Sequence, residues 1–165
     1  MIEIREMGDS EILELIKAVG YGHLACTDGK SPYVVPVHYG YQEPYIYLYT
    51  TEGKKSEIIG RNPRVCLQIE EVHGNKNWKS AIIDGEAEQL SDETERLKAL
   101  EAVVRVNPTL TPAVSIHWMD NWVRENIEVI FRITAAEMSG RASVVRSDLR
   151  AVFVPKKRPE RNAKT

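Results

Sequence analysis

The hydrophobic pattern of the chain begins with one amphipathic segment. Its apolar residues share the spacing i, i+3, i+4, i+7: Ile12, Leu15, Ile16 and Val19. This spacing predicts a helix with one apolar face. Asp9 or Ser10 is expected to cap it, because a side-chain oxygen there can accept from the free N–H groups of the first turn. Gly20 and Gly22 are expected to end it.

The pattern then changes to short apolar runs rich in β-branched and aromatic residues, which predicts strands. The predicted strands are residues 23–27, 33–39, 45–50, 65–69, 78–90 and 127–134. Asp28-Gly29 is typical of a hairpin turn, and Gly85 is expected to bend the long fifth strand. Pro36 has no N–H to donate, so one edge of the second strand is expected to be unpaired and free to face a ligand.

Two further helices are predicted among these strands. A short one spans about residues 55–60 and stops at Asn62-Pro63. A longer one is capped by Ser91 or Asp92 and ends at Asn107-Pro108. Its expected inner stripe comprises Leu97, Leu100, Val103 and Val104. The pattern of residues 116–126 is ambiguous.

Consecutive strands joined by short turns favour an antiparallel sheet or a small barrel over a parallel βαβ fold. The chain is therefore predicted to be mainly β, with flanking helices. Residues 1–140 are expected to form one domain. Residues 141–165 are expected to be a polar, partly disordered C-terminal extension.

Composition narrows the function classes. The 165 residues include 22 basic and 24 acidic side chains, a balance that argues against a dedicated nucleic-acid binder. No apolar run reaches membrane-spanning length, and the acidic N-terminal residues do not resemble a signal peptide. A cytoplasmic location is the resulting expectation. Cys26 and Cys66 lie in apolar runs and are expected to be buried free thiols.

The segment from Thr50 to Lys55 has the composition of a phosphate site. Two hydroxyl residues end a strand, and Gly53, Lys54 and Lys55 follow. Hydroxyl and ammonium groups that converge at a strand end suit a phosphate, although a solvated turn with surface lysines has the same composition. A P-loop is excluded because Leu48 stands where that motif needs glycine. The chain also has no G-x-G-x-x-G.

The histidines do not have the spacing of a metal site. His23, His38, His73 and His117 form neither H-x-H nor H-E-x-x-H, and the chain has no C-x-x-C. His38 is the most interesting because it lies beside Pro36, although a packed or surface strand histidine is the favoured interpretation. Trp118 and Trp122 are four residues apart, which suits a core, a dimer interface or the flank of a flat ring.

Four stretches together resemble the pyridoxamine 5′-phosphate oxidase-like family, within it the group related to nitroimidazole-resistance proteins. They are residues 22–25 with 32–39, residues 46–55, residues 62–66 and residues 78–87. Their order and spacing match the family across about residues 5–140. The resemblance implies a six-stranded antiparallel Greek-key split barrel. It also implies a homodimer with FMN in two clefts at the interface.

The resemblance also implies roles for individual residues. The isoalloxazine would be lined by Val35, Pro36, Val37 and His38. The ribityl phosphate would be held by Thr50, Thr51, Lys54 and Lys55. Trp78 and Ser80 would lie on the strand that reaches the cofactor or a group next to the cofactor. No side chain is required as a catalytic base, so the catalytic residue is left unknown with His38 near the ring as a candidate, and no metal is expected.

The function implied is an FMN-dependent oxidoreductase that passes electrons from a reduced nicotinamide to a small organic acceptor. Two alternatives stay open: a non-catalytic flavin-binding or sensing module, and a haem-binding member of the same fold with His38, His73 or His117 as ligand. Tyr49 stands at a position where the nitroimidazole-resistance group often has histidine. A role assigned to that histidine therefore cannot be transferred to this chain. The arginine-bearing C-terminal signature of the pyridoxamine phosphate oxidases is not found, so vitamin B6 synthesis is not expected.

Overall fold

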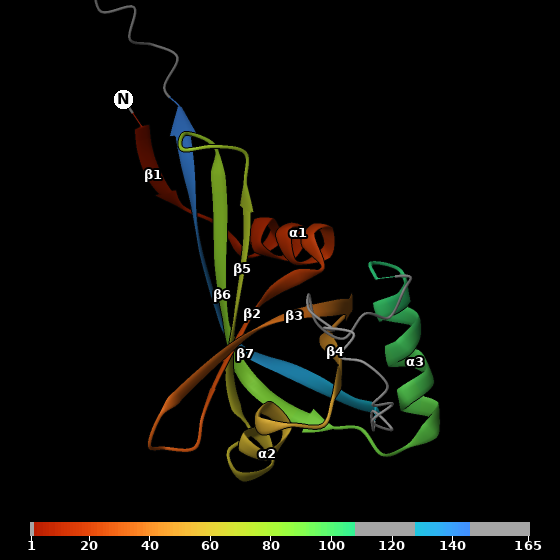
Figure 1. Ribbon diagram of the computed structural model, residues 1–165. Coiled ribbons are helices and arrows are strands. Elements are labelled where there is room, and N and C mark those ends of the chain that lie inside the picture. Colours follow the sequence, from red (N-terminus) through yellow and green to blue (C-terminus); the bar gives the residue numbers. More distant parts are fainter. Residues whose placement is uncertain (1, 108–127, 146–165) are drawn as a thin grey trace, which may run out of the picture.

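The computed structural model describes residues 2–107 and 128–145 (Figure 1). The described strands are β1 (Ile2–Glu6), β2 (Tyr21–Thr27), β3 (Pro32–Gln42), β4 (Tyr45–Thr51), β5 (Arg64–Val72), β6 (Trp78–Gln89) and β7 (Glu128–Val145). The described helices are α1 (Asp9–Val19), α2 (Lys54–Arg61) and α3 (Glu93–Val104). The segment 116–126, with His117, Trp118 and Trp122, lies outside the described residues. The tail beyond Val145 lies outside them as well, so the expectations for both segments are not tested.

The strands form one antiparallel sheet that closes on itself. The order is β1-β7-β4-β3-β2-β5-β6, and β6 pairs back onto β7, so six strands make a ring. β1 pairs with the C-terminal end of β7, and Glu6 lies opposite Arg141. The prediction of a mainly β, six-stranded split barrel is confirmed. β1 was not predicted, because its residues are exposed along its whole length and show no buried alternation.

The barrel interior is filled by alternate residues of the strands and closed by helices α1 and α2. α1 buries Ile12, Leu15 and Ile16 in this core, and α2 adds Ile58 and Ile59. Figure 1 shows α1 beside the long strands and α2 at the lower end of the barrel. The periodicity of the first helix is therefore confirmed, but its N-cap is Gly8 rather than Asp9 or Ser10.

α3 packs on the outside of β3 and β4, and the predicted stripe is confirmed in part: Val103 is buried and Leu100 packs against the same cluster, but Leu97 and Val104 are exposed. Ala99, Ala102 and Val103 are buried, whereas Leu97 is 54% and Val104 40% exposed. The reason is close packing. A β-carbon on Gly40 of β3 would lie 2.5 Å from the Ala102 carbonyl oxygen, so the helix approaches with its small residues.

β7 is much longer than the predicted strand 127–134, and it continues past Gly140 to Val145. A bulge explains the difference. Asp84 pairs with Glu137 and Gly85 with Ala135, so the residue between them, Ala136, has no partner on β6. An extra residue moves the inward side chains from odd to even positions, which breaks the alternation that sequence analysis follows. The predicted bend at Gly85 falls at this bulge.

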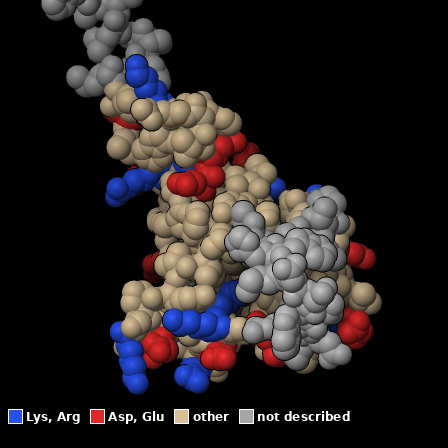
Figure 2. Space-filling view, viewed as in Figure 1, with Lys and Arg blue, Asp and Glu red and all other residues tan. Residues whose placement is uncertain are grey.

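One half of the barrel surface is not covered by the described helices. We call it the outer face. It consists of the outward residues of β3, β2, β5, β6, the second half of β7 and β1. Four large apolar side chains are exposed on it: Ile2, Ile4, Val34 and Val72. Figure 2 shows a large uncharged area at the upper end of the molecule, where β5 and β6 project beyond α1.

Candidate functional site

The site begins where β3 separates from β4. β3 pairs with β2 from Pro32 to His38, but it pairs with β4 only from Tyr39 to Gln42. Within the described chain, the β4-side edge of residues 32–38 therefore has no strand partner. The predicted open edge at Pro36 is confirmed, and it leaves backbone groups available to a ligand.

Thr50 and Thr51 lie at the end of β4, on the other side of this separation. They pair with Val129 and Glu128 of β7 instead of with β3. Thr50 faces the barrel interior and is only 2% exposed, and Thr51 is half-buried. A buried threonine hydroxyl at a strand end is a fixed donor or acceptor for a polar group in the opening.

The two lysines begin α2 directly after these threonines. Ser56 fixes the turn: its hydroxyl oxygen accepts from the Gly53 N–H at 2.9 Å and its O–H donates to the Gly53 carbonyl at 2.8 Å. Lys54 and Lys55 consequently lie in the first turn of the helix. Free N–H groups and the positive end of the helix dipole add to their charge there.

Lys55 is half-buried without an anionic partner. Among the described residues, no carboxylate forms an ion pair with it. Burial lowers the pKa of its ammonium group, and the nearby Cys26 thiol opposes that shift only in part. Burial in turn raises the pKa of Cys26. A buried cation without a counter-charge is unfavourable, so this position suits a bound anion.

Lys54 extends over the ring of Tyr33 at 4.8 Å from the ring centroid. This contact joins the start of α2 to the start of β3 across the opening, and it is a cation–π geometry. Figure 2 shows basic and acidic side chains mixed at this lower end of the molecule. Tyr33 and Cys26 were not among the predicted site residues, because only the folded chain brings them to the lysines.

The four predicted residues of β3 divide between the two faces of the strand. Val35 and Val37 point into the barrel, and Val37 is 1% exposed, so Val37 offers a ligand its backbone rather than its side chain. Pro36 and His38 point to the outer face. The His38 ring lies 5.4 Å from the ring of Tyr21.

Trp78 and Ser80 are not brought to the lysines within one chain. They lie on the outer face of β6, separated from β3 by β5 and β2. A polar row crosses this face: His23 Nδ1 is 3.1 Å from Gln68 Oε1, and Gln68 Nε2 donates to Ser80 Oγ at 3.4 Å. The other eight predicted residues lie on the unpaired part of β3, the end of β4 and the first turn of α2, whereas Trp78 and Ser80 lie elsewhere.

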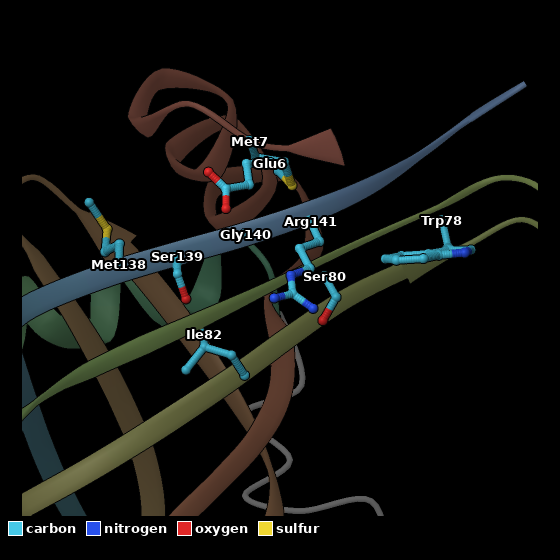
Figure 3. A pocket seen from close by; sticks show the side chains of 9 residues that line it. All are labelled: Glu6, Met7, Trp78, Ser80, Ile82, Met138, Ser139, Gly140 and Arg141. Atoms are coloured by element: carbon cyan, nitrogen blue, oxygen red, sulfur yellow. The ribbon is translucent and has the colours of Figure 1, made fainter. Parts of the chain in front are cut away.

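Trp78 and Ser80 instead line a groove of about 600 Å³ along β7. Figure 3 shows the Arg141 guanidinium lying beside Ser80, with Trp78 further along the same strand. Arg141 was not among the predicted site residues. The weak alternation after the bulge left its strand unrecognised, and with it the position of this arginine.

The described residues also fix the positions of the two cysteines and of His73. No group of three or more His, Cys, Asp or Glu side chains among the described residues is placed to hold a metal ion. Cys26 and Cys66 are free, with Cys26 buried and Cys66 half-buried. His73 is exposed beside Glu71 at 3.3 Å. None of the described helices is both long enough and apolar enough to span a bilayer.

The closed ring with a parted β3–β4 pair and a basic opening defines the class of split-barrel proteins. Residues 8–142 match the family model described as pyridoxamine 5′-phosphate oxidase, and the chain belongs to this family. The resemblance seen in the sequence is thereby confirmed.

Two solved structures are similar in fold to this chain, and one curated relative is similar in sequence. An FAD-binding protein from Mesorhizobium loti is 31% identical, with 84% of this chain and 97% of that chain covered and a TM-score of 0.71. A proposed 5-nitroimidazole antibiotic resistance protein from Bacteroides thetaiotaomicron is 22% identical, with coverages of 87% and 89% and a TM-score of 0.64, and shows the fold alone. An uncharacterised protein of Rhizobium meliloti is 32% identical over 87 residues, which are 53% of this chain and 58% of that protein. The matched region thus spans little more than half the length of this relative.

Proposed function

We propose that the protein binds FMN, with the phosphate between Thr50, Thr51, Lys54 and Lys55 and the ring along the open edge of β3. The observation that carries this proposal is the half-buried Lys55 ammonium without an anionic partner in the described chain. A phosphate would supply the missing negative charge, and the Thr50 and Thr51 hydroxyls lie at the adjoining strand end. Pro36 and His38 would lie beside the ring.

The test is an absorption spectrum of the purified protein, repeated after addition of FMN and desalting. Retained flavin bands support the proposal. The double variant Lys54→Ala with Lys55→Ala should lose most of the FMN affinity. The control variant Lys30→Ala with Lys98→Ala removes the same amount of charge elsewhere and should retain the FMN affinity. An unchanged FMN affinity in the first variant would show that the assigned phosphate site is wrong. A haem Soret band in the purified protein would favour haem over flavin as the cofactor.

FAD is a second candidate for the bound flavin. The relative from Mesorhizobium loti, at 31% identity, is an FAD-binding protein. The single lysine pair at the opening favours one phosphate and therefore FMN. Heat release of the flavin followed by chromatography separates the two cofactors, and an FAD peak would correct the choice of FMN.

We further propose that the protein is an oxidoreductase that passes electrons from a reduced nicotinamide to a small organic acceptor. A bound flavin would supply the redox chemistry, while the chain's own residues bind and orient it and limit water at the opening. Steady-state oxidation of NADH or NADPH above the rate with free FMN supports catalysis. No such excess would favour a flavin-binding or sensing module.

We propose a homodimer as the working form. The outer face exposes four large apolar side chains, Ile2, Ile4, Val34 and Val72, and apolar residues exposed on one face support a protein–protein interface there. A partner seated on this face would cover Trp78 and Ser80, the two predicted residues that the single chain leaves away from the lysines.

A further inference from the structure

Lys54 is held by an aromatic ring rather than by a carboxylate. Its Nζ lies over the Tyr33 ring, 4.8 Å from the ring centroid. No carboxylate of a described residue forms an ion pair with it, although Glu52 and Glu57 are close to it in the sequence. A ring face attracts an ammonium group without neutralising its charge. The charge of Lys54 therefore stays available to an anionic ligand.

Tyr33 presents its ring from a fixed part of the barrel. Its side chain points inward, as that of Val35 does, and packs against the buried core. The turn before it is held by Asp28 Oδ1, which accepts from the backbone N–H groups of Lys30 and Ser31 at 2.9 and 3.1 Å. The ring is therefore a fixed platform for a long and flexible lysine side chain.

The helix that carries Lys54 is fixed at the same end of the barrel. The Asn62 side-chain amide donates to the Thr27 carbonyl at 2.9 Å, which ties the C-terminal end of α2 to the end of β2. Ile58 and Ile59 bury the helix against the core. Figure 1 shows α2 and the β2–β3 turn at this lower end of the barrel. Both backbones are thus anchored, and the side chain of Lys54 is the flexible part between them.

The two lysines are restricted in different ways. Lys55 is half-buried, whereas Lys54 is exposed. An exposed lysine loses rotamer freedom when it closes on a ligand, and this loss weakens binding. The contact with the Tyr33 ring restricts Lys54 beforehand, in the helix turn that directly follows Thr50 and Thr51. Preorganisation of this kind raises affinity without adding a contact to the ligand.

We propose that Tyr33 is a positioning residue of the phosphate site, which acts through Lys54 rather than by binding the phosphate itself. Its ring places the Lys54 ammonium at the β3–β4 opening before the phosphate arrives. This inference rests on the proposed function, because it needs a phosphate beside the two lysines. It adds to that function a residue outside the phosphate-binding set and a physical reason for the affinity.

Fluorescence titrations of the full chain with FMN and with riboflavin test this role, because the two flavins differ only in the phosphate. Any bound flavin is removed first. Tyr33→Leu removes the ring face but keeps an apolar side chain. It should weaken FMN binding about three- to five-fold, the size of one cation–π contact, and change riboflavin binding by less than about 1.5-fold. Tyr33→Phe keeps a ring face and should restore the FMN affinity.

Tyr41→Leu is the matched control. Tyr41 lies on the same strand and packs against the same core, and its ring also lies near a lysine, with Lys17 Nζ 5.6 Å from the centroid. Because Lys17 belongs to α1 and not to the opening, the ratio of FMN to riboflavin affinity should not change. A double-mutant cycle then assigns the effect to Lys54. In the Lys54→Met background, Tyr33→Leu should weaken FMN binding no further.

Proton NMR measures the contact without any substitution at Tyr33, and a circular dichroism melt checks that Tyr33→Leu folds. The ring should shift the Lys54 ε-methylene protons, identified by their absence in Lys54→Met, upfield of those of the exposed Lys30 and Lys98. Three results would each overturn the inference. They are the absence of this shift, an equal loss of FMN and riboflavin affinity in Tyr33→Leu, and an undiminished loss of FMN affinity in the Lys54→Met background.

Failure of the proposed function is a separate result. If Lys54→Ala with Lys55→Ala retains the FMN affinity, the phosphate site itself is wrong. If that double variant loses FMN affinity while Tyr33→Leu keeps it, the phosphate site stands and the positioning role of Tyr33 is refuted.

Discussion

Tyr39 of β3 and Leu48 of β4 form the last registered pair before these strands diverge, and both are fully buried. The Tyr39 hydroxyl donates to the Ile16 carbonyl of α1 at 2.8 Å. The point at which the site opens is therefore held by the core and by a helix. The opening is a fixed feature of the barrel rather than a frayed strand end.

Tyr39→Phe removes this hydrogen bond and should reduce the free energy of unfolding by about 1 kcal/mol. Tyr41→Phe, on the same strand, should change it by less than about 0.5 kcal/mol. Burial raises the pKa of Tyr39 well above its ordinary value. The unfolded state therefore loses this proton first, and stability falls as the pH rises above ~10. Urea titrations between neutral pH and pH 11 measure both effects, and equal alkaline loss in Tyr39→Phe would contradict this role.

Gly40→Ala should be strongly destabilising. Its new β-carbon would lie 2.5 Å from the Ala102 carbonyl oxygen, so α3 must move away from the sheet. Such overpacking costs on the order of 1–3 kcal/mol. Gly60→Ala in α2 is the matched control, because no atom lies within 4 Å of the added carbon. It should raise stability by about 0.5–1 kcal/mol. Thermal melts of the two variants should shift in opposite directions.

Lys55→Met should separate stability from function. Removing a half-buried charge that lacks a partner should raise the Tm by about 2–4 °C for ~1 kcal/mol, while the FMN affinity falls.

The lowered pKa of Lys55 also predicts the direction in which the FMN affinity changes with pH. The phosphate requires the ammonium form, so affinity falls as the pH rises through that pKa, below the range of an exposed lysine. Fluorescence titrations with FMN across pH measure this dependence, which Lys55→Met should lack. Lys54→Met, at an exposed position, should not raise the Tm.

The sequence predicts most of the barrel and most of the site, because both depend on local patterns. Alternation and turn residues identify the central strands, and two hydroxyl residues followed by two lysines identify the candidate phosphate site. β1 and the second half of β7 were missed for different reasons. β1 buries no side chain, and the unpaired Ala136 inverts the alternation of β7.

The contacts that complete the site are not local. Tyr33 is 21 residues from Lys54 along the chain, and Arg141 is 61 residues from Ser80, as their numbering gives (54 − 33 and 141 − 80). Strand register brings Arg141 to Ser80, and the position of the start of α2 brings Lys54 to Tyr33. The face of α3 was predicted only in part for a similar reason, because the absence of a side chain at Gly40 selects Ala102 over larger residues at the contact.

Cys66 should be a slow thiol whose reactivity is set partly by Asp84, its neighbour across β5 and β6. Burial, followed by the charge of Asp84 and a hydrogen bond to it, raises the pKa of Cys66 to about 11. Asp84→Asn removes the charge and should speed alkylation by iodoacetamide several-fold at pH 8.5, since the thiolate is the reactive form. Peptide mass spectrometry distinguishes Cys66 from the more buried Cys26. An unchanged rate at Cys66 would leave burial as the whole cause.

Ile4→Arg tests the proposed dimer. Ile4 is 59% exposed on the outer face, so the substitution costs the single chain little, but it would place a charge among the apolar residues of the proposed interface. Leu97→Arg on α3, at a 54% exposed position, makes the same change away from that face. Light scattering should give a dimer for the parent and for Leu97→Arg, and a shift toward monomer for Ile4→Arg. If dimerisation brings Trp78 and Ser80 of one chain to the opening of the other, the monomeric variant should also bind FMN more weakly. A parent protein that is monomeric and still retains flavin would refute the interface and leave the lysine site standing.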